Sequence, residues 1–277
     1  MRLWVLSALE SSPTDALLLQ AAEVRGHEVQ LVRPWDAVRL LELGDRPDGI
    51  LPRTGASAPE EALEVLAQLE SMGIAVLNGA QELARARDKW STYEALRAAD
   101  VPTPPTVRLE LAKGLVGEIG EPPWYVKPAV GTQGRGVRRV TSTAELPEPS
   151  QEERWIVQRE VRGTVPGDVR VLVVDGTVLA AMRRRPAPDE HRANLHRGGQ
   201  ALPLELDEGT AACAREAAGA LGLGMAGVDL IPTTSGPYVL EVNGAPGLVG
   251  LVGLSSPERD LPGDVVCALE ARVATPG

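Results

Sequence analysis

Residues 226–243 read AGVDLIPTTSGPYVLEVN, and this stretch decides how the C-terminal part of the chain folds. Two apolar runs, 226–231 and 238–242, have the length and the aliphatic content of strands and are separated by a short polar turn. This pattern predicts an antiparallel hairpin, not the strand–helix alternation of a parallel sheet. We therefore expect an antiparallel sheet in the last third of the chain.

The predicted hairpin carries polar side chains on one face. Glu241 and Asn243 are two residues apart on one strand and so share a face. If the turn centres on Ser235, Asp229 lies opposite Glu241, with Cβ atoms about 4.5–5.5 Å apart. Two carboxylates this close repel each other unless a cation lies between them. Two carboxylates and a carboxamide suit Mg²⁺, and an ordinary hairpin with a polar face is the alternative.

The first 80 residues alternate short apolar runs with helical patterns, which is typical of a parallel α/β unit. The expected strands are residues 3–6, 28–32, 49–51 and 74–77, and the expected helices are residues 15–25 and 59–72. One helix is expected over residues 81–99, followed by a proline-rich linker at 101–105. Units of this kind serve many functions, so they do not indicate an activity.

Between the linker and the hairpin the pattern predicts further strands. They cover residues 124–127, 137–140, 155–158, 169–174 and 177–182, and a helix covers residues 206–221. Asp175-Gly176, between the last two strands, is the signature of a type I′ turn. The fold class expected for the whole chain is α/β (α+β).

Composition and charge limit the kinds of partner. The 277 residues carry 38 acidic and 28 basic side chains, and a net charge of −10 does not favour direct binding to nucleic acid or anionic lipid. The first apolar run is too short for a signal peptide or a membrane span. Cys213 and Cys267 are too few for a disulfide framework. We expect a cytoplasmic protein of about two domains, with no membrane partner.

A glycine-rich loop, PAVGTQGRG at residues 128–136, follows the predicted strand 124–127. Glycines let backbone N–H groups approach phosphates closely, and Lys127 can act as a point charge on a phosphate. No Gly-Lys-Ser/Thr follows, so this is not a Walker loop. A plain hairpin turn explains the loop about equally well. Its place between Lys127 and the acidic hairpin favours a phosphate site.

Basic side chains gather in two segments despite the negative net charge. Residues 183–185 are RRR, and residues 191–199 are HRANLHRGG. The second segment has no periodicity, so we expect a loop whose arginines bind phosphate or acyl phosphate. For the first segment a solvated surface is the alternative. Asp168 and Arg170 share one face of a strand, and Arg53 follows a strand end, where α/β sheets place ligands.

The order of these motifs resembles that of the ATP-grasp superfamily and, within it, of the RimK-type ligases, which add glutamate to a ribosomal protein C-terminus. The similarity covers nearly the whole chain from about Ile50 onward. It is carried by LPRTGAS (51–57), ARDK (86–89), VK and GTQG (126–134), RANLHRGG (192–199), AGVDL (226–230) and EVNGAPGL (241–248). The resemblance implies an ATP-grasp fold with an N-terminal parallel α/β pre-ATP-grasp domain (1–80), a central subdomain with a Gly-rich lid (81–158) and a C-terminal antiparallel-sheet subdomain (159–277).

The resemblance also implies roles for individual residues. The ligands of Mg²⁺ or Mn²⁺ would be Asp229, Glu241 and Asn243. Nucleotide contacts would come from Lys89, Lys127, Gly131, Thr132, Gln133, Gly134, Gln158, Arg159, Glu160, Asp168, Arg192 and Asn194. The catalytic residues would be Arg170, Arg192 and Asn194. The relatives carry Glu-Tyr where this chain has Arg159-Glu160, an exchange that is tolerable if backbone groups read the adenine.

The implied activity is that of an ATP-dependent carboxylate–amine ligase that forms an amide bond through an acyl phosphate. Its ligands would be ATP, Mg²⁺ and an amino acid, with glutamate as the amino acid that the resemblance favours. The expected acceptor is a protein or peptide C-terminal carboxylate, and the alternative is a small molecule or a carrier protein. A non-catalytic nucleotide-binding protein is a second alternative, against which the intact metal set argues. Related folds also suggest a homo-oligomer.

Overall fold

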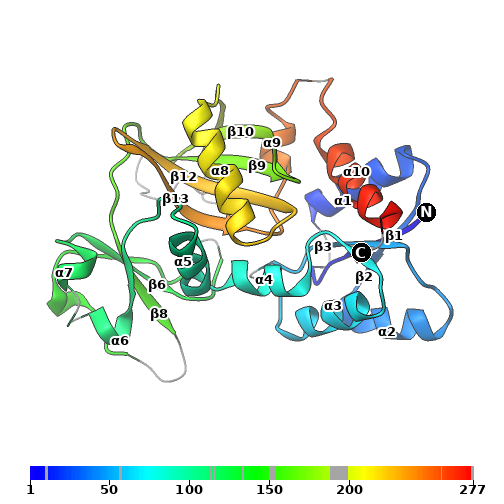
Figure 1. Cartoon of the computed structure of the whole chain (residues 1–277), viewed down its shortest axis with the longest axis horizontal. Coiled ribbons are helices and arrows are strands. Elements are labelled where there is room, and N and C mark those ends of the chain that lie inside the picture. Colours follow the sequence, from blue (N-terminus) through cyan, green and yellow to red (C-terminus); the bar gives the residue numbers. More distant parts are fainter. Residues whose placement is uncertain are drawn as a thin grey trace.

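The computed structural model describes residues 1–9, 12–55, 58–112, 114, 116–132, 134–149, 154–187, 199–256 and 258–275. They form three β-sheets that follow one another along the longest axis of the molecule (Figure 1). The first sheet is parallel and the other two are antiparallel, so the expected fold class is confirmed. Within the described ranges, every helix is too short or too polar to cross a lipid bilayer.

The N-terminal sheet has the strand order β2-β1-β3-β4. Its strands are β1 (Arg2–Leu6), β2 (Glu28–Val32), β3 (Gly49–Pro52) and β4 (Ala75–Val76), close to the expected positions. The helices between them are α1 (Pro13–Val24), α2 (Pro34–Glu42) and α3 (Glu61–Ser71), of which the sequence pattern does not predict α2. Because β2 and β3 lie on opposite sides of β1, the connection that leaves β1 and the connection that leaves β3 run in opposite directions across the sheet.

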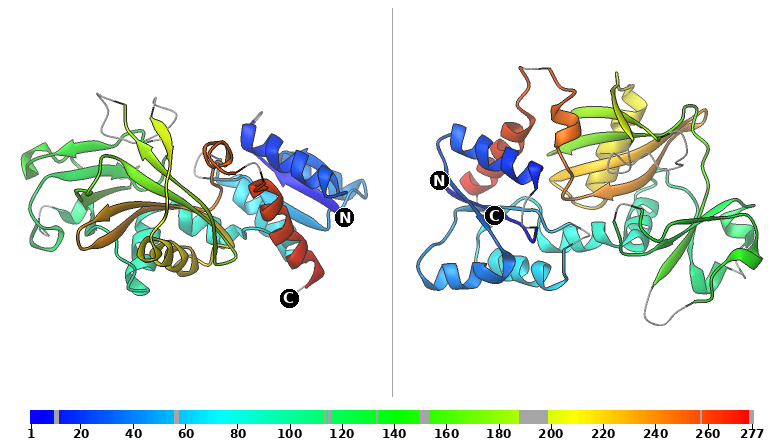
Figure 2. Two further views of the ribbon diagram at one scale, coloured as in Figure 1. Left: turned by 90° about the horizontal axis from the view of Figure 1, so that it is seen from above. Right: turned by 180° about the vertical axis from the view of Figure 1, so that it is seen from behind.

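The C-terminal helix α10 (Leu261–Ala274) returns to this N-terminal sheet. It lies beside α1 on one face, where Val265 and Leu269 share a core with Leu3 and Leu18 (Figures 1 and 2). Residues of α2 and α3 form a separate core with Trp4 on the other face. The last helix of the segment 159–277 therefore packs on the first 80 residues, while the domain limits themselves remain an interpretation.

The expected single helix over residues 81–99 is wrong, because the chain forms two helices there. They are α4 (Ala80–Arg87) and α5 (Lys89–Ala98), separated by Asp88 in an extended conformation. The Asp88 side chain caps α5 by accepting from the backbone N–H groups of Trp90 and Ser91, at 2.8 and 3.0 Å. Its backbone also forms an isolated β-bridge with Val130, so a contact distant in sequence fixes the break.

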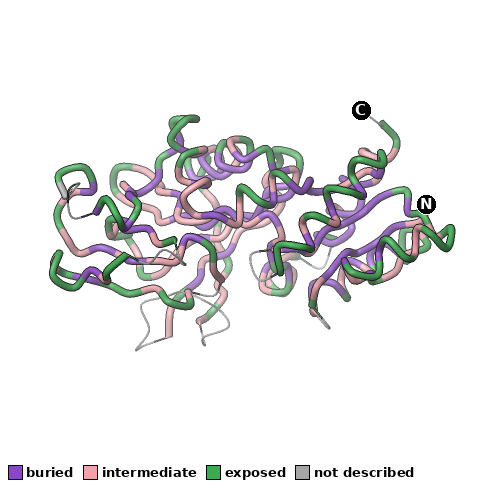
Figure 3. The backbone as a smooth tube through the Cα atoms, turned by 90° about the horizontal axis from the view of Figure 1, so that it is seen from below, coloured by how far each residue is buried: buried purple, intermediate pink, exposed green. Residues whose placement is uncertain are grey.

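The central sheet has the order β5-β8-β6-β7 and is antiparallel. Its strands are β5 (Thr106–Arg108), β6 (Trp124–Pro128), β7 (Arg138–Val140) and β8 (Trp155–Arg159), with the short helices α6 (Leu109–Ala112), α7 (Val116–Ile119) and η1 (Thr143–Glu145). The glycine-rich loop connects β6 to β7, which pair as a hairpin. The inner strands β1, β9 and β12 are buried over most of their length, whereas the edge strands β2, β7 and β11 are largely half-buried or exposed, and the helices alternate buried and exposed segments (Figure 3).

The C-terminal sheet has the order β11-β10-β9-β12-β13. Its strands are β9 (Asp168–Val174), β10 (Thr177–Arg185), β11 (Gln200–Pro203), β12 (Met225–Thr233) and β13 (Gly236–Asn243). Helix α8 (Glu208–Ala220) covers one face, and the short α9 (Val249–Val252) follows the sheet. Asp175 and Gly176 have φ values of 45° and 71°, as the predicted type I′ turn between β9 and β10 requires.

The hairpin β12–β13 places Asp229 opposite Glu241, as predicted, but not by the expected route. The strands pair from Thr233 and Gly236, so the turn contains two residues and does not centre on Ser235. An irregularity in the register after Asp229 adds one residue to β13 and restores the expected partner. Asp229 and Glu241 are paired across the two strands because of a bulge that the sequence pattern does not show.

Candidate active site

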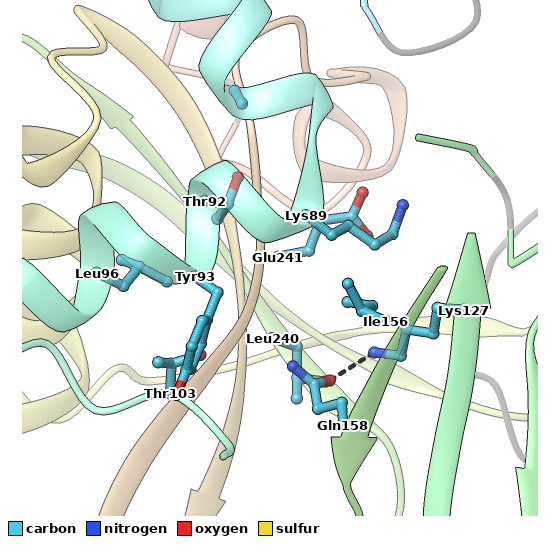
Figure 4. A pocket seen from close by; sticks show the side chains of 11 residues that line it. Lys89, Thr92, Tyr93, Leu96, Thr103, Lys127, Ile156, Gln158, Leu240 and Glu241 are labelled. Atoms are coloured by element: carbon cyan, nitrogen blue, oxygen red, sulfur yellow. Dashed lines mark hydrogen bonds between the residues drawn. The ribbon is translucent and has the colours of Figure 1, made fainter. Parts of the chain in front are cut away.

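A narrow cavity lies where α5 meets the central sheet and β13 (Figure 4). Lys89 and Tyr93 come from α5, Lys127 and Gln158 from the central sheet, and Glu241 from the C-terminal sheet. The rest of the lining comes from Ala86, Thr92, Leu96, Thr103, Ile156 and Leu240. Residues far apart in sequence thus meet at one place, and the cavity has an apolar floor with charged groups at one end.

Lys127 is a buried amine with a neutral partner. Its Nζ donates to Oε1 of Gln158 at 2.6 Å (Figure 4). Burial, together with the nearby charge of Lys89, lowers the pKa of Lys127 to about 8, and the charge of Glu241 opposes this shift. Apart from the ring of Tyr125, whose centroid is 6.0 Å from Nζ, the amine has only this neutral amide as a partner among the described residues, and a bound anion would relieve its unfavourable desolvation energy.

A short chain of hydrogen bonds fixes Gln158. Its Nε2 donates to Oγ1 of Thr106 at 3.0 Å, and that hydroxyl donates to the carbonyl of Pro104 at 2.8 Å. Both Gln158 and Thr106 are buried. Because the Thr106 hydroxyl donates its proton to Pro104, it can only accept from Gln158. The amide nitrogen of Gln158 therefore points to Thr106, and its oxygen points to Lys127.

Lys89 joins α5 to the glycine-rich loop. Its Nζ donates to the carbonyl of Gly131 at 2.9 Å, and its backbone N–H donates to the carbonyl of Ala129 at 2.8 Å. Lys89 therefore holds the start of the glycine-rich loop at the cavity, and Gly131, Thr132 and Gly134 belong to this loop. Gln133 lies outside the described residues. The two lysines and the start of this loop form one positively charged edge.

The hairpin carboxylate Asp229 is buried and paired with two arginines. Nε and Nη2 of Arg170 donate to its two oxygens at 2.7 and 2.8 Å, and Nη2 of Arg184 lies 2.7 Å from Oδ2. Burial alone would raise the pKa of Asp229, but the two guanidinium groups outweigh it and hold the pKa below its usual range. Arg170 lies directly opposite Asp229 on the neighbouring strand β9.

Arg184 binds a second carboxylate, that of Asp168. Nε and Nη2 of Arg184 lie 2.6 and 2.7 Å from the two oxygens of Asp168. Burial and the nearby negative charge of Asp229 raise the pKa of Asp168 to about 6. Arg184 favours the charged carboxylate but does not outweigh them. Asp168 and Arg170 share one face of β9, as predicted, and the four side chains form one compact ionic network.

The proposed metal ligands have suitable chemistry. Glu241 lies opposite Asp229, and the Asn243 side chain sits two residues further along β13 with its Oδ1 accepting from the backbone N–H of Ala245 at 2.9 Å. Two carboxylates and a carboxamide form an all-oxygen set that fits Mg²⁺ with waters or phosphates as its other ligands. In the described part of the chain there is no cluster of three His, Cys, Asp or Glu side chains that could hold a metal, so this mixed set is the candidate.

Arg159 and Glu160 lie at the end of β8, and both backbone N–H groups are used within the protein. Arg159 donates to the carbonyl of Pro105 at 2.9 Å, and Glu160 donates to the carbonyl of Pro123 at 3.0 Å. The Glu160 carboxylate accepts from Arg139 at 2.7 and 3.1 Å. A role for these two residues in adenine binding remains a prediction. Arg192 and Asn194 lie outside the described residues, so their placement is not tested.

Sequence reasoning missed the side chains that hold the loop after Asn243. Asn78 is buried and donates to the carbonyls of Met225 and Gly244, both at 2.7 Å. Oγ1 of Thr14 accepts from the N–H of Leu248 at 3.0 Å. These contacts join the N-terminal part of the chain to the β12–β13 hairpin and the loop after it across more than a hundred residues of sequence, so no local spacing signals them.

Comparisons with known proteins agree with this geometry. A family model described as "RimK-like ATP-grasp domain" matches residues 86–255. A "Probable alpha-L-glutamate ligase" of Aliivibrio fischeri (strain MJ11) is 33% identical over 298 residues, which cover 99% of this chain and 97% of the relative.

Solved structures show the same fold. A RimK domain ATP-grasp protein from Sphaerobacter thermophilus DSM 20745 has a TM-score of 0.72 at 24% identity and covers 98% of this chain and 100% of its own. The ATP-grasp ligase PsnB, solved with minimal precursor, Mg and ADP, has a TM-score of 0.69 at 21% identity and covers 98% of both chains. The length of the match and the identity to the curated relative show that the chain belongs to the RimK-like ATP-grasp family of ATP-dependent ligases.

Proposed function

We propose that this ligase adds glutamate to the C-terminal carboxylate of a protein or peptide through an acyl phosphate. The observation that carries the proposal is the charge pattern of the cavity, in which Lys89 and Lys127 face Glu241 while neither lysine has a carboxylate partner among the described residues. The choice of glutamate is supported by the name of the curated relative. The choice of a peptide acceptor is supported by the fold neighbour PsnB, which was also solved with a precursor peptide and AMPPNP.

In the proposed first step an acceptor carboxylate oxygen attacks the γ-phosphorus of ATP. One O–P bond forms, the bond to the β-phosphate oxygen breaks, and ADP leaves. Lys127 and Lys89 hold phosphate oxygens, and the desolvated amine of Lys127 gains a counter-charge that it lacks in the free protein. Asp229, Glu241 and Asn243 would hold Mg²⁺, which neutralises phosphate charge when bound.

The arginines beside Asp229 would serve the second step. In the free protein Arg170 and Arg184 neutralise that carboxylate. If Asp229 held the cation, its pairing with the arginines would loosen, and Arg170 and Arg184 would then be available to stabilise the oxyanion that develops at the acyl carbon. The glutamate nitrogen attacks the acyl carbon, the C–O bond to phosphate breaks, phosphate leaves, and the amine proton passes to solvent.

Product masses test the proposal directly. The enzyme is incubated with ATP, Mg²⁺, glutamate and either a peptide ending in glutamate, a small carboxylic acid or an amino-acid carrier protein. We expect ADP release that requires both glutamate and the peptide, with a peptide mass increase of one or more glutamate residues. ADP release with only a small molecule or a carrier protein would contradict the peptide acceptor, and an unchanged peptide mass with another amino acid incorporated would contradict glutamate.

A further inference from the structure

Arg53 lies at the point of the N-terminal sheet where α/β folds place ligands. It directly follows β3, and its backbone N–H donates to the carbonyl of Leu6 at the end of the neighbouring strand β1, at 2.7 Å. The helix after β1 packs on one face of the sheet and the helix after β3 on the other. The crevice outside the carboxyl ends of two such strands is the usual ligand position.

The side chain of Arg53 is held rigidly by two partners. Its Nε donates to Oδ1 of Asp15 at 3.0 Å, and its Nη1 donates to the carbonyl of Pro246 at 3.0 Å. Asp15 lies in the first turn of α1, and Pro246 follows the proposed metal ligand Asn243 by three residues. The guanidinium group is therefore fixed between the N-terminal sheet and the loop that leaves the metal-ligand hairpin.

One end of this guanidinium group stays free. Nη2 of Arg53 has no hydrogen-bond partner among the described residues, and it is not one of the fully buried unpaired atoms, so it remains accessible. Only 9% of the side chain is exposed, so a ligand that reaches Nη2 meets a largely desolvated charge. Nearby, Oδ2 of Asp15 and Oγ1 of Thr54 are buried and have no partner in the described part of the chain.

We propose that Arg53 binds a carboxylate of a substrate at the seam between the N-terminal sheet and the metal-ligand hairpin. A planar guanidinium group whose other nitrogens are already bound presents Nη2 in one fixed direction, which suits a charge-assisted hydrogen bond to a carboxylate oxygen. The proposal rests on the proposed function, in which both the amino acid and the acceptor tail carry carboxylates. It places substrate recognition on the N-terminal sheet, apart from the nucleotide cavity.

Arg53 could instead act only as a link between two parts of the fold. Arg25 provides a matched control, because its Nε and Nη2 donate to Glu270 of α10 at 2.7 and 2.6 Å and also join distant parts of the chain. Arg53→Gln, Arg53→Lys and Arg25→Gln are compared with the wild type. The measurements are KM for glutamate and for a peptide ending in glutamate, the Kd of Mg·ADP, and the midpoint of thermal unfolding.

We expect Arg53→Gln to raise the KM of one of the two carboxylate substrates by about 30-fold or more, with Mg·ADP binding within twofold of the wild type. Arg53→Lys keeps the positive charge but not the planar guanidinium group, so it should raise the same KM by a smaller factor. It also provides a second variant in case Arg53→Gln fails to fold. Arg25→Gln should leave both KM values within twofold. Equal KM values in wild type and Arg53→Gln would overturn the inference, as would a rise in both KM values and in the Kd of Mg·ADP together.

Carboxamide analogues show which carboxylate is bound. For the amino acid, glutamine lacks the side-chain carboxylate and glutamate α-amide lacks the α-carboxylate. For the acceptor, a peptide with a terminal or an internal glutamine lacks the side-chain carboxylate at that position. The analogue that lacks the bound carboxylate should lose affinity in the wild type but not in Arg53→Gln. If the wild type releases no ADP with glutamate, the proposed function fails. The inference about Arg53 is then tested separately, by titrating the peptide into the Mg·AMP-PNP complexes of the wild type and of Arg53→Gln. Binding lost in Arg53→Gln supports the inference, while equal binding or none to the wild type contradicts it.

Discussion

The two sides of the candidate site, the lysine cavity and the neighbouring network around Asp229, handle charge in opposite ways. On the C-terminal sheet the Asp229 carboxylate is neutralised by Arg170 and Arg184 at hydrogen-bond distance. On the central sheet Lys127 has the neutral amide of Gln158 as its partner and a second lysine nearby. One side is thus balanced in the free protein, and the other lacks an anion. The difference supports the proposal that the lysine side receives phosphate, and under that proposal Asp229 would have to exchange arginine contacts for a cation.

Glu241 lies between these two sides. It is opposite Asp229 on the hairpin and also lines the cavity with Lys127, whose pKa it raises through its charge. Among the described residues Glu241 makes no ion pair within 4.0 Å, in contrast to Asp229. Its carboxylate is therefore free to contact a metal ion without first breaking an arginine pair, and it should be the side chain on which both sides depend most.

The largest effect is expected for Glu241→Gln. The amide keeps the shape of the side chain but removes the charge that the metal and the lysines require, so ADP release should fall by about 10³-fold or more. Glu216→Gln is the matched control, because Glu216 is exposed on α8, which packs on the same sheet. Turnover is measured by ADP formation and folding by thermal unfolding. Unchanged turnover in Glu241→Gln would sink the metal assignment.

The second largest effect is expected for Lys127→Met, which removes the cation of the unbalanced side. Loss of a charge-assisted contact to phosphate in a desolvated site should weaken Mg·ADP binding by about 100-fold. Arg138→Met is the control, since Arg138 is an exposed cation on the neighbouring strand β7. Binding is measured by calorimetric titration. If both variants weaken binding equally, the effect comes from general charge and not from the cavity.

A sequence pattern could predict the acidic face of the hairpin because alternation along a strand is local. It could not predict the bulge that brings Asp229 opposite Glu241, and the assumed turn centre at Ser235 reached the right pairing for an incomplete reason. The sequence pattern also did not predict the break between α4 and α5 at Asp88. Aspartate is compatible with a helix, and the bridge from Asp88 to Val130 is a tertiary contact.

The sequence pattern also could not predict which side chains pair with the charged groups of the site. Lys127 was predicted to meet phosphate, yet nothing in its local pattern indicates that Gln158, 31 residues later, is its partner. The pairing of Asp229 with Arg170 depends on the register between two strands 59 residues apart. Local periodicity gives the face on which a side chain lies, and the packing of distant strands decides which charges meet.

A smaller effect is expected for Gln158→Met, which tests whether the neutral partner of Lys127 positions it. The change removes the 2.6 Å hydrogen bond to Lys127 and leaves Oγ1 of Thr106 without its donor, so Mg·ADP binding should weaken by about tenfold. Gln30→Met is the control, because Gln30 of β2 donates to Asp45, in the connection between α2 and β3, at 2.6 Å. Tight nucleotide binding in Gln158→Met would show that Lys127 needs no amide to hold it in place.

The smallest effect concerns pH. The pKa of Lys127 in the free protein is about 8, mainly because of burial, and bound phosphate should raise it because the opposite charge favours the protonated amine. Above pH 8 the free protein must therefore take up a proton to bind nucleotide, and affinity falls as pH rises. Between pH 7 and 8.5 we expect the Kd of Mg·ADP to increase about fourfold in the wild type and to stay constant in Lys127→Met. Calorimetric titrations in buffers of different ionisation enthalpy measure the proton uptake directly. A wild-type Kd that is flat over this range would show that Lys127 stays charged without an anion, and the contrast between the two sides of the candidate site would then be one of geometry alone.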